Sequence, residues 1–212
     1  MKINYTLNIT VGLVSLFMVT LGAIGQTKLP GPPREGDERL VTPLINAGIA
    51  LNESSLCKAL SNQDSTIAAR AASALARFPK SRRIVHALET AVAADRDIVS
   101  LDAAYSLLEL NEKAWVATGA ARLRAMHNPL LQIQFAGLLA RAGNTAGWSL
   151  ITSKITDERF TPIVLENIDY FDGKIGPSGR RIKVVEELER LSGETPEGSR
   201  KLIAQKLAQL KT

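Results

Sequence analysis

Apolar side chains recur with a fixed period of 32 residues through the middle of the 212-residue chain. The segment Ile67-Ala-Ala-Arg-Ala-Ala-Ser-Ala-Leu75 is echoed by residues 99–107, by residues 131–139 and, more weakly, by residues 163–171. Within each copy the apolar positions fall at i, i+4, i+5 and i+8, which places them on one face of a helix. A fixed period of this kind is typical of a repeat architecture. The pattern therefore predicts a stack of helical repeats.

A further helical segment and a polar turn precede these copies. The turns are expected at residues 62–64, 94–96 and 127–129, where Asp, Asn and Pro favour chain reversal and the start of a helix. Each repeat is thus expected to be a pair of helices joined by such a turn. The copy of the 67–75 segment is the second helix of its pair.

Alanine is abundant in the repeats, and aromatic residues make up only 5% of the chain. Alanine has the highest helix propensity of all residues. Ala72, Ala104 and Ala136 occupy the same position in successive copies, where a small side chain lets neighbouring helices approach closely. The predicted fold class is all-α: a right-handed α-solenoid of about four helix pairs with cap helices.

Atypical helices are expected at both ends of the array. An apolar pattern from Leu40 to Leu51 predicts an N-terminal cap helix with Pro43 in its first turn, where the missing N–H costs nothing. The Gly/Pro-rich segment 172–181 interrupts the pattern, and two closing helices are expected over residues 182–191 and 195–210.

The first 25 residues have the features of a secretory signal peptide. Lys2 precedes an uncharged apolar run from Ile9 to Ile24, and Ala23 and Gly25 are small residues placed for cleavage. The alternative is an uncleaved N-terminal anchor. The expected organisation is therefore a signal peptide or anchor (1–25), an exposed Pro/Gly-rich linker (26–38), a repeat array (39–173) and a C-terminal helical cap with a basic tail (174–212).

The charge distribution narrows the choice of partners. The formal net charge is +5, but residues 26–173 carry equal numbers of basic and acidic side chains. Residues 174–212 hold nine basic against five acidic side chains, so the excess lies in the tail. A continuous basic groove for nucleic acid is not indicated. The single cysteine, Cys57, falls on an apolar helix and is expected to be a buried, inert thiol.

The paired helices, the Asp or Asn turns and the "Ala-Ala-x-x-Leu" second helices resemble HEAT repeats, and are most similar to the short bacterial HEAT-like variety. The resemblance covers roughly residues 40–172 and implies that the second helices line a concave binding surface. The fourth copy departs from it, with Asn167 and Ile168 in place of the alanines. The usual arginine before the alanines is present only at Arg70.

Two enzyme-related resemblances provide alternative interpretations. The segment 107–114 is similar to the repeat tails of some secreted bacterial sulfatases, although the sulfatase motif of Cys or Ser followed by x-Pro-x-Arg is missing. Bilin lyases also carry short HEAT-like repeats. Either resemblance implies an accessory domain or a relative of a repeat-bearing enzyme.

The exposed face of the second helices carries the candidate protein-binding residues. The repeat register places side chains of opposite charge one repeat apart, with one tyrosine as an amphipathic anchor. These residues are Arg70, Arg77, Tyr105, Glu109 and Arg141. The structural alternative is a ladder of ion pairs between repeats, with Arg70 bound to Asp102 and Glu109 held between Arg77 and Arg141.

Other candidate chemistry is sparse. Arg180 and Arg181 follow a Gly-rich loop at a helix start, where an anion could bind, although a solvated turn is the simpler interpretation. His86 and His127 lack neighbours at metal-ligand spacing, so no metal or cofactor site is expected. Trp115 and Trp148 occupy nearly equivalent positions and are expected to pack in the core, the alternative being a platform on which a sugar stacks.

These patterns together predict an exported, periplasmic or secreted scaffold with no catalytic activity. A protein partner is expected on the second helices, and no nucleic acid. Contact with a membrane is expected only through an uncleaved N-terminal segment. The third interpretation is an envelope structural protein held by that segment.

Overall fold

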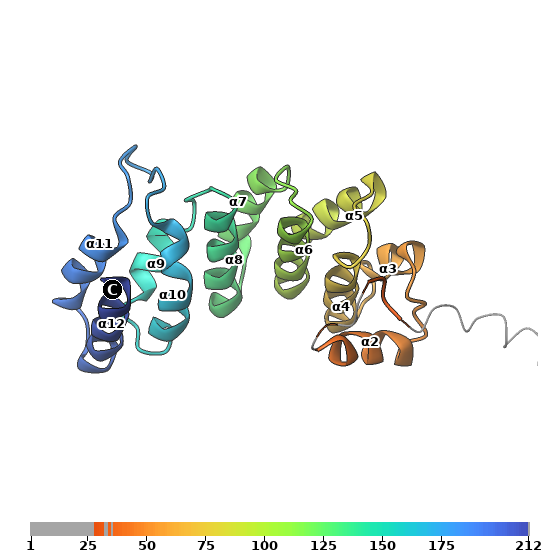
Figure 1. Cartoon of the computed structure of the whole chain (residues 1–212), viewed down its shortest axis with the longest axis horizontal. Coiled ribbons are helices and arrows are strands. Elements are labelled where there is room, and N and C mark those ends of the chain that lie inside the picture. The colour runs from red at the N-terminus through yellow and green to blue at the C-terminus, as the bar shows by residue number, and fades with distance from the viewer. Residues whose placement is uncertain (1–27, 32–33, 35, 212) are drawn as a thin grey trace, which may run out of the picture.

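The computed structural model describes residues 28–31, 34 and 36–211, and over these residues it is almost entirely helical (Figure 1). An isolated antiparallel bridge between Ile175 and Arg181 is the one β-type pairing in the described part of the chain. The predicted all-α class is confirmed. The helices are α2 (Asp37–Asn46), α3 (Glu53–Ala59), α4 (Ser65–Leu75), α5 (Arg82–Ala93), α6 (Asp97–Glu109), α7 (Val116–Ala125), α8 (Pro129–Arg141), α9 (Trp148–Lys154), α10 (Thr161–Asn167), the 3₁₀ helix η1 (Ile168–Phe171), α11 (Val184–Ser192) and α12 (Glu197–Leu210).

The helices stand side by side along the long axis of the molecule (Figure 1). One row is formed by direct packing of α4 on α6, α6 on α8 and α8 on α10, and a second row by α3 on α5 and α5 on α7. Each helix of the second row packs on the next helix in the chain, as α5 does on α6. The chain therefore alternates between two layers, and α2 and α12 cover the two ends of the first row.

Small side chains allow the close packing within the first row. Ala72, Ala104 and Ala136 are all fully buried, which confirms the register derived from the repeat. The Ser106 hydroxyl of α6 donates a hydrogen bond of 2.9 Å to the carbonyl oxygen of Ala72 in α4. A side chain this short reaches the neighbouring backbone only because the two helices lie close together.

The expected capping turns are present before two of the second helices. Asp64 accepts a hydrogen bond from the backbone N–H of Thr66 at 2.8 Å, and Asn128 accepts one from Leu130 at 3.0 Å. Arg96 occupies the equivalent position before α6 and makes no such cap. A guanidinium has no acceptor, and Arg96 instead donates to the carbonyl oxygens of Leu60 and Asn62 in the preceding repeat.

The N-terminal part differs from the expectation in two respects. The first helix, α2, begins at Asp37, ends at Asn46 and carries Pro43 at its seventh position, so the prediction of Pro43 in the first turn is wrong. Gly36 precedes the helix with a positive φ of 85°, a conformation that glycine adopts without strain. Leu29, in the linker expected to be exposed, is buried against the core.

The fourth repeat is short, because α10 ends at Asn167 and the chain continues as η1. Residues 172–183 then form a hairpin that extends beyond the helix ends (Figure 1). None of the helices in the described residues is both long and apolar enough to cross a bilayer. The predicted signal peptide or anchor, residues 1–25, lies outside the described part of the chain.

Candidate functional site

Three side chains from neighbouring elements form an exposed row along the second helices. The guanidinium carbon of Arg141, the last residue of α8, lies 5.8 Å from the ring centroid of Tyr105 in α6 and 5.3 Å from that of Tyr170 in η1. Both distances fit cation–π contacts. Tyr105 is 43% exposed and Tyr170 is 40% exposed. Arg141 therefore bridges two accessible aromatic rings from different repeats.

The 3₁₀ helix explains how Tyr170 joins this row. The 32-residue register matches Tyr105 with Asp169. A 3₁₀ helix has three residues per turn, so the side chains of η1 shift relative to an α-helical register. Asp169 is bound by Lys206 of α12, and its Oδ1 atom is buried. Tyr170 was not identified from the sequence, because the switch in helix type is not visible in the repeat pattern.

Two exposed apolar side chains lie on this same side of α6 and α8, near the start of each helix. Ile98 is 38% exposed and Leu130 is 45% exposed. They precede Tyr105 and Arg141 by seven and eleven residues, close to two and three turns of an α-helix, so each shares a face with its partner. The surface formed by Ile98, Tyr105, Leu130, Arg141 and Tyr170 is called the second-helix face below.

Arg70 and Asp102 lie beside this face and differ from the expected ion pair. Asp102 accepts a hydrogen bond of 3.3 Å from the Ser73 hydroxyl. Burial raises the pKa of Asp102 above its ordinary value, while the Ser73 hydrogen bond and the charge of Arg70 act in the opposite direction. Arg70 thus influences Asp102 through space, and the dominant effect on this carboxyl is its removal from water.

Arg77 and Glu109 are bound by the N-terminal segment, so the predicted ladder through Glu109 is wrong. Arg77 donates to Asp37 of α2 at 2.5 Å, and its side chain is only 5% exposed. Glu109 pairs with Arg34 at 3.8 Å. The repeat register could not include these partners, because Arg34 and Asp37 precede the repeats in the sequence. Of the five predicted binding residues, the structure brings Tyr105 and Arg141 together on the exposed surface.

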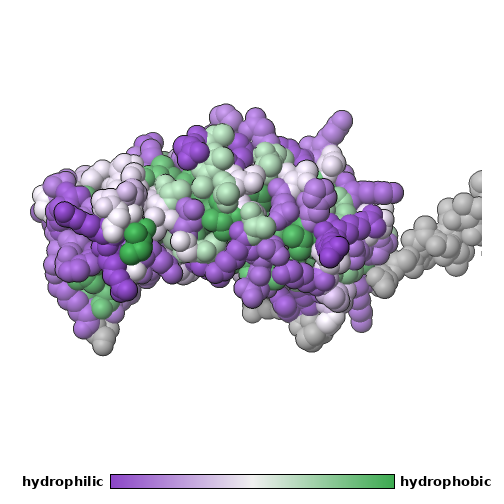
Figure 2. Space-filling model, turned by 90° about the horizontal axis from the view of Figure 1, so that it is seen from above, coloured by the Kyte–Doolittle hydropathy of each residue, from purple (hydrophilic) through white to green (hydrophobic). Residues whose placement is uncertain are grey.

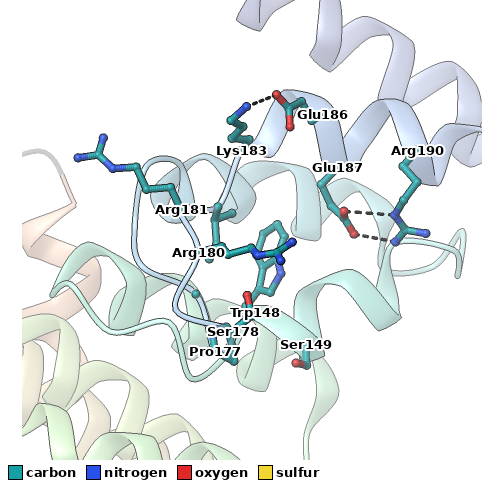
Figure 3. A pocket seen from close by; sticks show the side chains of 12 residues that line it. Trp148, Ser149, Pro177, Ser178, Arg180, Arg181, Lys183, Glu186, Glu187 and Arg190 are labelled. Carbon is teal, nitrogen blue, oxygen red and sulfur yellow. Dashed lines mark hydrogen bonds and ion pairs between the residues drawn. The ribbon is translucent and has the colours of Figure 1, made fainter.

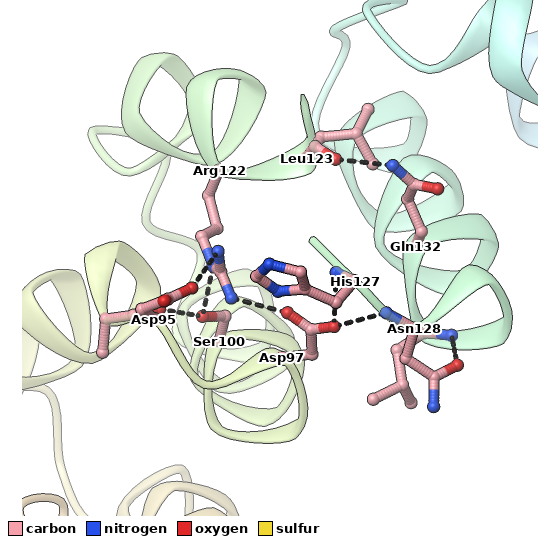
Figure 4. Close-up of polar contacts among 10 residues, drawn as sticks. Asp95, Asp97, Ser100, Arg122, Leu123, His127, Asn128 and Gln132 are labelled. Atoms are coloured by element: carbon pink, nitrogen blue, oxygen red, sulfur yellow. Dashed lines mark hydrogen bonds and ion pairs between the residues drawn. The ribbon is translucent and has the colours of Figure 1, made fainter. Parts of the chain in front are cut away.

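A polar network inside the array joins consecutive repeats (Figure 4). The Arg122 side chain of α7 is only 4% exposed, and it donates to Asp95 at 3.0 Å, to Asp97 at 2.5 Å and to the Ser100 hydroxyl at 3.2 Å. Asp97 also accepts from the backbone N–H groups of His127 and Asn128 at 2.8 and 2.6 Å. One carboxylate therefore ties α6, α7 and the turn before α8 together.

A shallow groove is lined by the end of α5, by α7 and by the turn that follows α7. These two helices lie uppermost in Figure 1. The groove encloses about 710 Å³, and exposed alanines such as Ala121 and Ala125 form part of its lining. Figure 2 views this side and shows apolar side chains in the middle of a largely hydrophilic surface. Alanine lacks the bulk of the aromatic and arginine anchors that dominate binding interfaces. The lining also includes the exposed Arg124, so substitutions at Ala121 and Arg124 serve as charge-matched controls for the second-helix face.

A cleft of about 570 Å³ lies between the 172–183 hairpin, α9 and the start of α11 (Figure 3). Both predicted anion-binding residues, Arg180 and Arg181, line it. Trp148 and Ser149 contribute to it from α9. The sequence indicated the two arginines but not their proximity to Trp148, because the two segments are about a repeat apart in the chain.

The two tryptophans have different environments. Trp115 is 1% exposed, donates to the carbonyl oxygen of Glu112 at 3.0 Å and packs edge-on against Phe135, which confirms its predicted core position. Trp148 packs on Phe171 with ring centroids 5.5 Å apart but also lines the cleft. The expectation that both are core residues is thus confirmed for Trp115 and incomplete for Trp148.

The remaining candidates show no assembled reactive centre. Burial raises the pKa of the half-buried Cys57 thiol, which disfavours the reactive thiolate at neutral pH. His86 and His127 line different pockets, and no group of three His, Cys, Asp or Glu side chains is placed to hold a metal ion within the described residues. No protein-family model matches the chain, and neither does a curated protein or a solved structure.

Proposed function

We propose that the chain is an exported α-solenoid of HEAT-like repeats that binds a protein partner through the second-helix face and catalyses no reaction itself. The 32-residue period and the two rows of stacked helices support the solenoid. The apolar run from Ile9 to Ile24, followed by Gly25, supports export.

The observation that carries the binding proposal is the row of Tyr105, Arg141 and Tyr170. Tyrosine and arginine are among the residues most enriched at energetic hot spots of protein interfaces. Here the three side chains come from three consecutive repeats, and the cation–π contacts already order them. Little conformational entropy would remain to be lost on binding, which favours affinity.

The side chains of this face also indicate which side chains the partner would present. The partner would place apolar side chains against Ile98 and Leu130, and an acidic side chain near Arg141. A partner that is itself an enzyme would favour the accessory-domain alternative, whether sulfatase-associated or bilin-lyase-like. Detection of intact residues 1–25 in the mature protein would favour the membrane-anchored structural alternative.

The test is a crosslinked pull-down from envelope and secreted fractions with the Tyr105→Ala/Arg141→Glu variant. The matched control is Ala121→Ser/Arg124→Glu, which makes the same change of charge on the exposed side of α7. The proposal expects one partner to be lost with the first variant and kept with the control, at unchanged helicity. Equal recovery of every partner with both variants would contradict it.

A further inference from the structure

The cleft beside the hairpin is held in a defined shape by hydrogen bonds. Gly173 donates its N–H to the carbonyl oxygen of Ile182 at 2.8 Å, and Ile182 donates to the carbonyl of Lys174 at the same distance. The Thr145 hydroxyl donates to the carbonyl of Ile175 at 2.9 Å, which attaches the hairpin to the loop before α9. The side chain of Ile182, within the hairpin, is buried. The walls of the cleft are therefore present before any ligand arrives.

The charges in the cleft do not cancel. Glu186 is paired with Lys183 at 2.5 Å, and Glu187 with Arg190 at 2.7 Å (Figure 3). Within the described residues, Arg180 and Arg181 have no carboxylate partner. The two acidic side chains of the lining are thus already neutralised by other cations. Two guanidinium groups remain to give the cleft a positive potential.

The neutral part of the lining also suits a polar ligand. Ser149 and Ser178 offer hydroxyl groups, and the indole N–H of Trp148 donates to no acceptor among the described residues. The Arg180 side chain lies beside the Trp148 ring in Figure 3. Hydrogen-bond donors, the Arg180 guanidinium and an aromatic wall therefore face one space, while the Arg181 side chain extends outward from the rim of the cleft (Figure 3).

We propose that this cleft binds a sulfate or phosphate group, with Arg180 contacting the group, Arg181 adding positive charge at the rim, and Trp148 contacting the molecule that carries the group. Guanidinium groups bind such oxyanions through paired N–H donors, and more strongly than neutral donors do. A sugar ring that carries the oxyanion can lie against the indole, as apolar ring faces do on aromatic side chains. A solvated turn alone requires neither the aromatic wall nor the unpaired arginines.

The experiment titrates the chain with sodium sulfate, sodium phosphate, glucose 6-sulfate and glucose 6-phosphate at constant ionic strength. Binding is followed by calorimetry on the natural chain and by tryptophan fluorescence in a Trp115→Phe background. Trp148 is then the sole tryptophan, because the chain contains two. Saturable binding is expected for at least one oxyanion class. Tighter binding of the sugar ester identifies a sugar-borne group as the source, and equal binding identifies the free ion.

The variants separate a site from general charge attraction. Arg180→Ser/Arg181→Ser is expected to weaken binding at least tenfold, since each charge-assisted hydrogen bond contributes about that factor. Arg82→Ser/Arg124→Ser removes two exposed arginines elsewhere and is expected to leave binding unchanged. An absence of saturable binding by calorimetry, or equal loss in both double variants, would overturn the proposal.

Discussion

Gly137 lies within α8, and a residue distant in the sequence explains why glycine occupies this position. Glycine costs about 1 kcal/mol relative to alanine inside a helix. A Cβ atom at this position would lie 2.0 Å from Oδ1 of Asn167, whose Nδ2 donates to the carbonyl oxygen of Ile163 at 2.8 Å. The space that a larger residue would need is therefore filled by α10. This contact between α8 and α10 outweighs the helix propensity of the single position.

We therefore expect Gly137→Ala to destabilise the chain by about 1–3 kcal/mol, as overpacking does in well-packed interiors. Asn167→Ala in the same chain should remove the clash and restore most of the loss. Urea unfolding of both single variants and the double variant measures the coupling. A stabilising Gly137→Ala would show that the two side chains do not compete for this space.

Asp102 gives a second test at this scale. Burial raises its pKa in the folded state, so folding favours the protonated form. The stability that the protonated Asp102 side chain adds to the folded chain is therefore fully present below the ordinary pKa of 3.8. This stability is lost as the pH rises through the higher pKa of the folded state. Asp102→Asn should increase the free energy of unfolding at neutral pH, with the gain disappearing under acidic conditions. Thermal unfolding across this pH range checks the sign, and a loss of stability at neutral pH would contradict it.

At the scale of elements, the ion pairs and hydrogen bonds of the Arg122 network link α7 to α6 and to the turn before α8. The buried Arg122 side chain binds two carboxylates, the exposed Asp95 and the largely buried Asp97. Asp97 also accepts from two backbone N–H groups of the next turn. Removing one partner of a buried ion pair leaves the other charge without compensation. The network thus makes the packing of α6, α7 and α8 interdependent.

Arg122→Met should therefore lower the free energy of unfolding by about 3–5 kcal/mol. Arg124→Met is the matched control, since Arg124 is exposed on the same helix, and we expect a change within about 0.5 kcal/mol. Chemical denaturation with circular dichroism measures both. Similar small effects of the two substitutions would mean that the network contributes little to stability.

The sequence predicted the elements better than the contacts between them. The paired helices, the capping turns at Asp64 and Asn128, and the buried alanine register all follow from local patterns that repeat along the chain. The start of α2, the partner of Arg77 and the position of Tyr170 do not, because each depends on segments outside the repeat or on a change of helix type. The Arg122 network was not predicted, because Arg122 and its partners Asp95, Asp97 and Ser100 are far apart in the sequence.

At the scale of the whole molecule, the stacked arrangement predicts that a destabilising substitution mainly affects the helices next to it. In a linear array each repeat contacts only its neighbours, so stability is roughly a sum of local terms. The closing helix α12 packs mainly on α10 and α11. Ile203 in α12 is fully buried. A cavity at this position should therefore weaken the C-terminal end first.

Ile203→Ala should cost about 2–5 kcal/mol locally, the usual range for such a core truncation. We expect amide hydrogen exchange to accelerate in α10, α11 and α12 and to remain unchanged in α3 and α4. Exchange followed by mass spectrometry of peptides resolves the two ends of the molecule. A uniform acceleration along the chain would instead indicate one cooperative unit and argue against the proposed solenoid.

Site-specific photo-crosslinking in the native cell can show whether the second-helix face binds a protein partner. A photoreactive amino acid replaces Tyr105 in one chain and Ala121, on the exposed side of α7, in another. We expect a discrete crosslinked product from position 105 that Arg141→Glu abolishes, and no such product from position 121. A product from position 121 alone, or equal products from both positions, would contradict it.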